Sequence, residues 1–414
     1  MASRVIRMLY FVREPFPTYR PDVEVLFGRE LLKRGHEIDF VMQAGSDRDS
    51  LGPRPWHGRT VWVGATDSGV GLLHRLRKYY RALMHDLRML RLARAGRYDA
   101  VQVRDKFLIA AVAASVARRR GLKFFYWLSF PEPESQLQRA RDRTARYPLL
   151  TYVRGVAFAW LLYRWILPRC DHAFVQSEQM RRDISSHQID LDKLTAVPMG
   201  VVASDVSPPQ ESPAAESPTA PHSMIIAYLG TLSSQRRLEV LVEMLAILLR
   251  GPVKVRLLMV GDGDEPEDRK RIERRADELG VRDHLEITGF IPQPQALMRV
   301  RTAAICISPY FPSPILRSTS PTKLVDYLGL GIPVVANDHP EQRSVLKDSR
   351  AGVCVPWGAR FFAKGVAWLA ACGALERHRM GERGRRWVLE NRTYAQIADR
   401  LEGKYLELLS VSNQ

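Results

Sequence analysis

Short apolar runs typical of β-strands alternate with segments of helical periodicity along this 414-residue chain, and the alternation occurs twice. Strands that alternate with helices form parallel sheets through βαβ crossovers, so the pattern predicts an α/β fold. In the first half the predicted strands are Ile6–Val12, Glu37–Met42, Thr60–Val63, Ala100–Val103, Lys123–Leu128 and His172–Val175. In the second half they are Met224–Leu229, Val255–Val260, Leu285–Thr288, Ala304–Ser308, Pro333–Ala336 and Gly352–Val355.

One segment interrupts this alternation. Residues 203–223 hold five prolines and no aromatic residue, so they cannot build a hydrophobic core. The chain also exceeds the usual size of one domain, about 100–200 residues. We therefore predict two Rossmann-like parallel-sheet domains that face a central cleft. They occupy residues 1–203 and 223–390, with a Pro/Ser-rich linker at 204–222 and a C-terminal helix at 391–414 that returns to the first domain.

The composition excludes several classes of protein. Charged residues make up 26% and aromatic residues 9% of the chain, close to the globular average, which argues against wholesale disorder. No C-x-x-C spacing joins the four cysteines, so neither a zinc ribbon nor a disulfide framework is expected. The longest apolar stretch, Gly155–Tyr163, is too short for a membrane-spanning helix and is flanked by arginines.

The net charge of +17 is concentrated in the first half. Residues 1–205 hold 34 of the 62 Lys and Arg residues but only 21 of the 45 Asp and Glu residues. Such an excess indicates an anionic partner, either a phosphate-bearing substrate, an acidic membrane surface or nucleic acid. No compact nucleic-acid recognition motif accompanies the charge, so specific nucleic-acid binding is not expected.

Residues 70–97 are predicted to form a basic amphipathic helix. Its apolar stripe consists of Leu73, Leu76, Tyr80, Leu83, Leu87 and Leu90, and the basic residues closest to its start are Arg75, Arg77, Lys78 and Arg81. Such a helix binds an anionic membrane surface, or packs its stripe against a sheet, and the two are compatible. The aromatic segment at residues 149–168 has the same two interpretations.

Loops that follow strands carry the candidate binding groups, because ligands of parallel sheets bind beyond the carboxyl ends of the strands. Gly230 follows a strand and precedes Arg236 and Arg237, an arrangement that suits an anion, although a solvated turn has the same appearance. In residues 260–264 the glycines indicate a tight turn more strongly than the Asp-Gly-Asp sequence indicates a metal site.

Residues 318–335 are the most informative segment. Small hydroxyl residues and Pro321 mark the start of a helix, whose free amides form an anion site assisted by Lys323. Asp326 follows in the next turn, where its carboxylate accepts hydrogen bonds from sugar hydroxyls or complements the helix dipole.

Eight segments of the chain, in their order, resemble a known family. They are Leu31–Ile38, Asp171–Glu178, Val197–Val201, Tyr228–Leu232, Leu258–Gly263, Ile287–Ile291, Ile307–Pro309 and Pro321–Val335. Together they resemble the retaining glycosyltransferases of family 4, glycosyl transferases group 1, which have the GT-B fold. The resemblance extends over nearly the whole chain.

The resemblance implies transfer of a sugar from a nucleotide-sugar donor, held mainly by the C-terminal domain, to an acceptor held mainly by the N-terminal domain. It implies retention of the anomeric configuration and no metal or other cofactor. In such enzymes Arg236 corresponds to a diphosphate ligand, Asp326 to a ribose ligand, and Phe290 with Ile291 to a loop facing the nucleobase. The full set of implied donor-binding residues is Gly230, Arg236, Phe290, Ile291, Ser318, Ser320, Thr322, Lys323 and Asp326.

Three positions depart from the family pattern. Thr231 stands where an arginine is usual, so one phosphate ligand is missing unless Arg237 or Lys323 substitutes for it. Ser318 stands where the first of two characteristic glutamates is usual. The histidine of the N-terminal domain is absent, which leaves no assigned catalytic residue. The polar residues near its place are Ser129, Glu132 and Glu134.

The basic first half favours an acceptor at a membrane. We expect a lipid-linked or polysaccharide intermediate as acceptor and a cytoplasmic protein that associates peripherally with the inner face of the plasma membrane. Two alternatives remain open. One is a degenerate, non-catalytic GT-B partner subunit, which Thr231 and Ser318 favour, and the other is a nucleotide-sugar epimerase on a similar scaffold.

Overall fold

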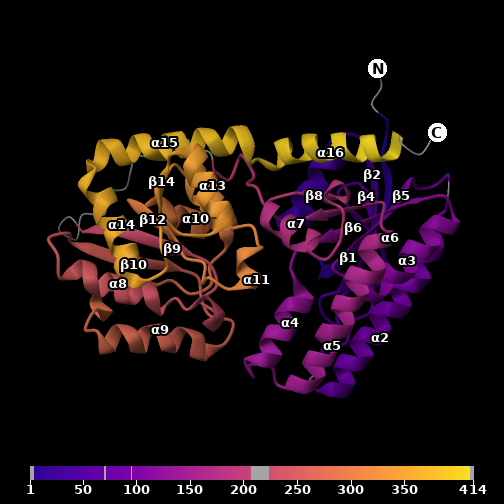
Figure 1. Cartoon of the computed structure of the whole chain (residues 1–414), viewed down its shortest axis with the longest axis horizontal. Coiled ribbons are helices and arrows are strands. Elements are labelled where there is room, and N and C mark those ends of the chain that lie inside the picture. Colours follow the sequence, from indigo (N-terminus) through magenta and orange to yellow (C-terminus); the bar gives the residue numbers. More distant parts are fainter. Residues whose placement is uncertain (1–3, 70, 95, 207–222, 411–414) are drawn as a thin grey trace. The chain divides into compact units, whose positions relative to one another are not determined.

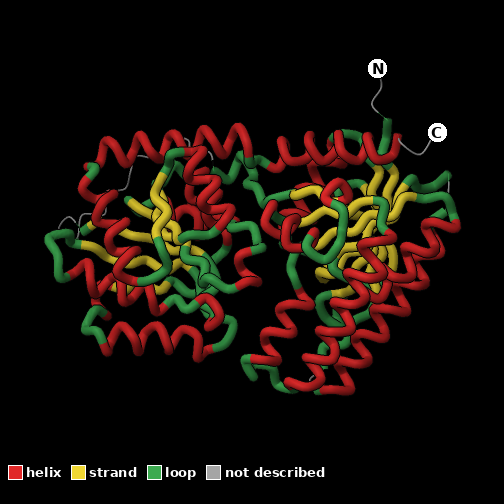
Figure 2. The backbone as a smooth tube through the Cα atoms, viewed as in Figure 1, coloured by secondary structure: helices red, strands yellow, loops and turns green. Residues whose placement is uncertain are grey.

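The computed structural model describes residues 4–69, 71–94, 96–206 and 223–410, which form two compact units. Unit 1 comprises residues 1–198 and 394–414, and unit 2 comprises residues 199–393. In each unit a central sheet is surrounded by helices (Figures 1 and 2). The linker predicted at residues 204–222 lies outside the described residues, except for residues 204–206.

The described part of unit 1 contains an eight-stranded sheet with the order β3-β4-β2-β1-β5-β6-β7-β8, parallel except for the β3–β4 pair. Its strands are β1 (Arg7–Phe16), β2 (Glu37–Ala44), β3 (Gly52–Trp56), β4 (Arg59–Gly64), β5 (Ala100–Arg104), β6 (Lys123–Leu128), β7 (His172–Val175) and β8 (Leu194–Ala196). Its helical segments are η1 (Asp22–Glu30), α1 (Leu31–Lys33), α2 (Leu72–Met89), η2 (Leu90–Leu92), α3 (Phe107–Arg119), α4 (Glu132–Arg141), α5 (Pro148–Trp160), η3 (Leu161–Ile166), α6 (Leu167–Arg169), α7 (Glu178–Ser185), η4 (Leu191–Lys193) and α16 (Tyr394–Ser410).

The described part of unit 2 contains a six-stranded parallel sheet with the order β11-β10-β9-β12-β13-β14, the arrangement of a doubly wound nucleotide-binding fold. Its strands are β9 (Met224–Leu229), β10 (Val255–Val260), β11 (Leu285–Ile287), β12 (Ile305–Ser308), β13 (Val334–Asn337) and β14 (Gly352–Val355). Its helical segments are η5 (Ser234–Arg236), α8 (Glu239–Leu249), α9 (Pro266–Glu278), η6 (Arg282–His284), α10 (Gln293–Arg301), α11 (Pro314–Arg317), α12 (Thr322–Gly329), α13 (Pro340–Ser349), α14 (Ala359–Ala371) and α15 (Gly373–Asn391). None of the helices in the described ranges combines the length and apolarity needed to cross a membrane.

The α/β architecture predicted from the sequence is confirmed, because each predicted strand is present with small shifts of its ends. Two strands were not predicted. β3 contains Pro53 and Pro55, which are tolerated because it lies at the sheet edge, and β8 has only three residues. The helix predicted over residues 70–97 is shorter, since α2 ends at Met89 and one 3-10 turn follows.

The central strands are buried on both faces, which explains why apolar residues predominate in them. Every residue of β5 is buried, and Val101 and Val103 belong to the core of unit 1 together with Tyr126 of β6. In unit 2 the equivalent core contains Met259 of β10 and Ile307 of β12.

The last helix, α16, is part of unit 1 although it follows all of unit 2 in the chain. The hydroxyl of Tyr405 donates to the side chain of Gln102 on β5, and both residues are buried. Arg34, just after α1, forms an ion pair with Asp399 at 2.6 Å. These contacts fix α16 against the face of the unit 1 sheet that η1 also covers.

Candidate active site

Three glycines mark the carboxyl edge of the unit 2 sheet. Gly230, Gly261 and Gly289 follow β9, β10 and β11, with φ values of 134°, 138° and 76° that disfavour any residue with a side chain. A Cβ atom on Gly261 would lie 2.4 Å from the carbonyl oxygen of Gly230, and one on Gly230 would lie 2.5 Å from Cε of Lys323. The loops thus approach one another through bare backbone, and a side chain from α12 enters the space left open.

That side chain, Lys323, is a buried cation. It lies in the first turn of α12, where the first amides of the helix have no partner inside the helix. Its Nζ lies 5.0 Å from the ring centre of Tyr228 and 5.4 Å from that of Tyr310, and it forms no ion pair within the described ranges. Burial lowers the pKa of Lys323 well below its usual value, and the charge of Arg236 lowers it further. An anion bound here would favour the charged ammonium.

The two arginines after Gly230 have different surroundings. Arg236 ends the short helix η5, and its guanidinium donates to the hydroxyl of Tyr228 at 3.4 Å, beside the ring that Lys323 contacts. Arg237 has a left-handed backbone, is exposed, and stacks on the ring of Phe311 at 4.4 Å. Of the two substitutes considered for the arginine missing at Thr231, Lys323 lies beside Gly230, whereas Arg237 is held on Phe311.

Asp326 lies one turn after Lys323 on α12 and is only partly exposed. Burial raises the pKa of Asp326 to about 7, the negative charge of Asp205 raises it further, and Lys323 opposes the shift. The carboxyl group is therefore close to its midpoint near neutral pH and accepts hydrogen bonds from hydroxyl groups in either state.

The hydroxyl residues before α12 are largely engaged within the unit. The hydroxyl of Ser320 donates to Glu341 at 2.8 Å and accepts the amide of Met199 at 3.0 Å, so its oxygen serves the fold. Ser318 is buried, with its hydroxyl 3.5 Å from the carbonyl oxygen of Pro314. Thr322 opens the helix and is partly exposed. Helix amides, together with Lys323, are thus the donors best placed for an anion.

The loop after β11 presents Phe290, which is 68% exposed, while Ile291 packs partly against the unit 2 core. The hydroxyl of Thr288 accepts the amide of Gly261 at 3.2 Å, which ties this loop to the one after β10. An exposed phenylalanine on an anchored loop offers a flat apolar surface for a ring.

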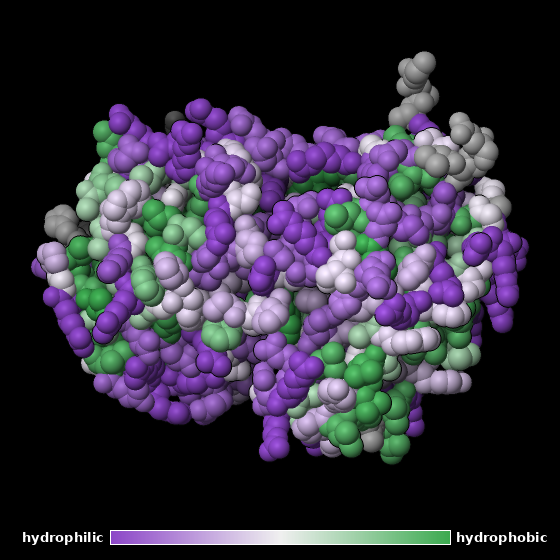
Figure 3. Space-filling model, in the orientation of Figure 1, coloured by the Kyte–Doolittle hydropathy of each residue, from purple (hydrophilic) through white to green (hydrophobic). Residues whose placement is uncertain are grey.

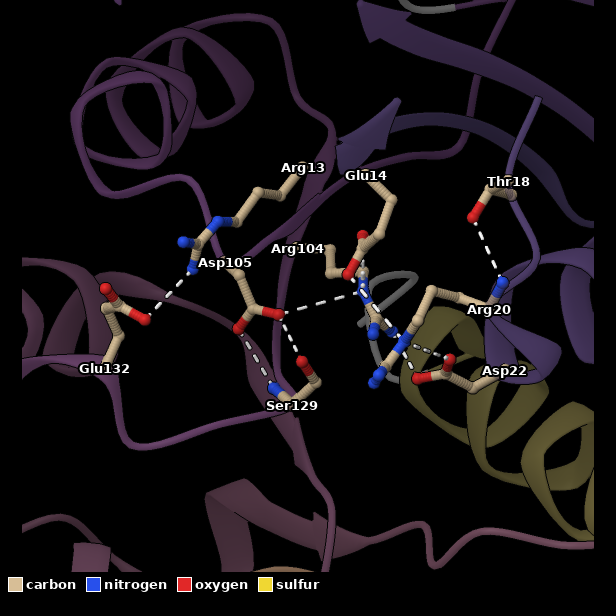
Figure 4. A network of polar contacts seen from close by, with 9 residues as sticks. All are labelled: Arg13, Glu14, Thr18, Arg20, Asp22, Arg104, Asp105, Ser129 and Glu132. Carbon is tan, nitrogen blue, oxygen red and sulfur yellow. Dashed lines mark hydrogen bonds and ion pairs between the residues drawn. The ribbon is translucent and has the colours of Figure 1, made fainter. Parts of the chain in front are cut away.

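Of the three candidate residues in unit 1, Ser129 and Glu132 lie at one polar site around Asp105 (Figure 4), and Glu134 does not. Ser129, after β6, donates from its amide to Asp105 at 3.0 Å and from its hydroxyl to the same carboxylate. Glu132, at the start of α4, pairs with Arg13 at 3.3 Å (Figure 4). Glu134 is elsewhere engaged, since it accepts the hydroxyl of Tyr163 at 2.6 Å.

The charged residues that surround Ser129 were not predicted from the sequence. Arg104 is fully buried at the end of β5 and pairs with Glu14 at 3.0 Å, with Asp105 at 3.7 Å and with Asp22 (Figure 4). Asp105 has a left-handed backbone at φ 51°, and burial raises its pKa against the opposing charge of Arg104. The available signal was Arg104-Asp105, two charged residues at the end of a buried strand. Within the described residues no group of three His, Cys, Asp or Glu side chains is arranged to hold a metal ion.

The comparisons with known proteins cover both units. A family model described as Glycosyltransferase Family 4 matches residues 25–205, and one described as Glycosyl transferases group 1 matches residues 210–387. A comparison with curated protein sequences gives no significant match.

Solved structures resemble the chain over almost its whole length. Sucrose-phosphate synthase from Thermosynechococcus elongatus has a TM-score of 0.74 at 16% identity and covers 98% of this chain and 100% of its own. Anabaena HepE in complex with UDP has a TM-score of 0.66 at 12% identity, with coverages of 97% and 100%. WaaG, a glycosyltransferase involved in lipopolysaccharide biosynthesis, has a TM-score of 0.66 at 14% identity, with coverages of 96% and 99%. The chain therefore belongs to the glycosyltransferases of group 1 and family 4, and it is a transferase with the GT-B fold.

Proposed function

We propose that this enzyme transfers a sugar, with retention of configuration, from a nucleotide-sugar donor bound by unit 2 to a lipid-linked or polysaccharide intermediate at the cytoplasmic face of the membrane. The observation that carries the donor assignment is Lys323, a buried cation without an ion pair among the described residues, beside the bare backbone of Gly230. A diphosphate supplies the negative charge that this position lacks.

Each group at the carboxyl edge of unit 2 has a role in this proposal. Lys323, Arg236 and the first amides of α12 stabilise the charge that develops on the leaving diphosphate, which is the largest contribution expected in such a transfer. Asp326 accepts the ribose hydroxyls, and Phe290 contacts the base. We expect no metal or other cofactor, because these cations neutralise the diphosphate.

Retention follows in this proposal from reaction on one face of the sugar. The acceptor hydroxyl attacks the anomeric carbon from the side that the diphosphate leaves, and a diphosphate oxygen takes up the hydroxyl proton. Glu132 in unit 1 then orients the acceptor hydroxyls and is not needed as a base. This explains why a family histidine can be absent.

The named relatives support the class of donor and of acceptor. One HepE structure contains UDP-glucose, which favours a nucleotide-sugar donor here. WaaG acts in lipopolysaccharide biosynthesis, which favours a lipid-linked acceptor. The exposed basic side chains of α2, namely Arg75, Arg77, Lys78 and Arg81, suit the same location.

Thermal stabilisation tests the donor site directly. UDP, GDP, ADP and dTDP sugars are added at fixed concentration, since a ligand of the native state raises its apparent stability. We expect one nucleotide class to raise Tm, and Arg236→Ala and Asp326→Ala to abolish the shift. Arg237→Ala is the matched control, because that neighbour stacks on Phe311 and should leave the shift intact.

The same samples separate the alternatives. No shift with any donor supports a non-catalytic partner subunit. An isomerised sugar after incubation of the donor without acceptor supports an epimerase. The anomeric configuration of the product, read by NMR, tests retention, and an inverted product would overturn that part of the proposal.

A further inference from the structure

Exposed apolar side chains gather on one part of unit 1. They belong to the first half of α2 and to α5, and Figure 3 shows hydrophobic residues over the end of unit 1 where Figure 1 labels these helices. The side chains that form this surface, here called the docking face, are Leu73, Leu76 and Tyr80 of α2 and Leu149, Val153 and Trp160 of α5. Leu73 and Leu149 are the most exposed, at 80% and 78%.

The helix α2 divides into a buried and an exposed half. Its second half is anchored, because buried Asp86 binds Nζ of Lys106 at 2.8 Å and accepts from Gln43 at 3.1 Å. Leu87 packs against the core of unit 1. The first half is held by polar contacts to the loop before it, such as His74 with buried Asp67 at 2.7 Å, and the leucines of its apolar stripe remain exposed.

The helix α5 is also apolar on two sides. One side packs inward, since Gly155 lies so close to α4 that a Cβ atom there would be 3.0 Å from Leu137, and Phe158 stacks on Phe107 at 4.8 Å. The other side carries Leu149, Val153 and Trp160 at helical spacing and is more than half exposed at each. Burial within the unit does not explain this second stripe.

The two exposed stripes form one surface. The guanidinium of Arg154 on α5 lies 5.2 Å from the ring centre of Tyr79 on α2 and 5.2 Å from that of Phe158. This contact holds the helices side by side, so that their outward faces are continuous.

The charge around the docking face indicates which kind of partner it binds. α5 contains no acidic residue, and the single acidic residue of α2, Asp86, is buried and paired. Exposed Arg75, Arg77 and Lys78 flank the α2 stripe. Two copies of this surface would repel each other, whereas an anionic bilayer offers both headgroups for the cations and hydrocarbon for the leucines.

We infer that the docking face binds an anionic lipid bilayer, with leucine and tryptophan side chains entering its interface. The inference rests on the proposed membrane location of the acceptor and assigns it a surface. α4 adds a functional reason, because it begins at Glu132, in the polar site around Asp105 (Figure 4), and its ten residues span about 15 Å before the turn into α5. A sugar linked to a lipid held at the docking face is thus within reach of that site.

Co-sedimentation with vesicles tests the inference. Wild type should bind vesicles of phosphatidylcholine and phosphatidylglycerol and should bind pure phosphatidylcholine weakly. Leu76→Ser/Leu149→Ser should lower the partition coefficient by about tenfold or more, because each exposed leucine loses its transfer into hydrocarbon. Met298→Ser/Leu375→Ser, on unit 2, is the matched control, since those side chains are 67% and 64% exposed and should not affect binding.

The outcomes separate this inference from the proposed function. Equal binding by the leucine variant and wild type overturns it, as does a dimer that the same variant dissociates in sedimentation velocity. Donor-induced stabilisation of the leucine variant should equal that of wild type. Vesicle binding without any donor response refutes the transferase proposal alone, and a donor response without vesicle binding refutes the docking face alone.

Discussion

At the scale of single residues, the candidate donor site consists of groups that reduce the stability of the protein when no donor is bound. Lys323 is a buried basic residue with a lowered pKa, and Asp326 is a carboxyl group with a raised pKa. An apolar residue at either position would pack the helix against the sheet without the cost of burying an ionisable group. Residues at strand ends that lower the stability of the protein are candidates for ligand binding, because their interactions with the ligand offset the lost stability.

Lys323→Met should therefore separate stability from binding. The substitution replaces a buried amino group, which is costly to bury, by an apolar side chain of similar length, so we expect the free energy of unfolding to rise by about 1–3 kcal/mol while donor-induced stabilisation disappears. Urea denaturation and Tm shifts measure the two effects. Lys347→Met on α13, where the lysine is exposed, should change neither. A less stable variant that still responds to donor would contradict the assignment.

Asp326 should make stability depend on pH. Its pKa in the folded protein is about 7, above the ordinary value of 3.8, so the folded state holds a proton that the unfolded state releases between these values. Stability should fall as pH rises through this window. Asp326→Asn should then be more stable than wild type at pH 8, by roughly 1–3 kcal/mol, and equal to it near pH 4. Denaturation at both pH values checks this, with Asp348→Asn, at an exposed position, as control.

At the scale of elements, α2 carries one continuous apolar stripe, but of its described residues only those near Asp86 pack against the core. The contact of Asp86 with Lys106 and Gln43 lies where the helix enters the core. Before that point the leucines of the stripe, Leu73 and Leu76, are exposed, and after it Leu87 and Leu90 pack against the core of unit 1. Periodicity reports the stripe but not the position of this division.

Asp86→Ala should destabilise unit 1 by about 2–4 kcal/mol, because Lys106 and Gln43 then lose their partner in a buried place. Combining it with Lys106→Met should recover part of the loss, since no unpaired charge remains. Denaturation of the two single variants and the double variant forms the cycle that measures the interaction. Additive losses would show that the pair does not anchor the helix.

At the scale of the whole molecule, the chain order differs from the order in space. α16 is synthesised after unit 2 and completes unit 1, where Tyr405, Ile397 and Leu401 are buried. The stability of unit 1 therefore depends on residues nearly 200 positions beyond its own boundary at residue 198.

Tyr405→Ala should lower the free energy of unfolding of unit 1 by about 3–5 kcal/mol, the usual cost of removing a fully buried aromatic side chain. Hydrogen exchange should show faster exchange in β5 and β6 and no change in β9 and β10. Leu375→Ala on α15, an exposed position, serves as the control. Faster exchange in unit 2 as well would mean that the units unfold together.

Sequence patterns were enough to predict most strands and to single out the residues of the candidate donor site. Alternating runs located the buried strands because central parallel strands are apolar on both faces, and β3 and β8 were missed because prolines or brevity remove that signal. Gly230, Lys323 and Asp326 were recognisable because one short turn and one helix start carry them.

The tertiary structure determines which side chains remain free to bind a ligand. It engaged the hydroxyl of Ser320 with Glu341, held Arg237 on Phe311 and left Lys323 beside Gly230. It also assembled Glu14, Asp22, Arg104 and Asp105 from three separate segments and exposed half of each apolar stripe on α2 and α5. Local sequence records propensity and periodicity, whereas burial and pairing depend on residues that are distant in the chain and meet only when the sheets form.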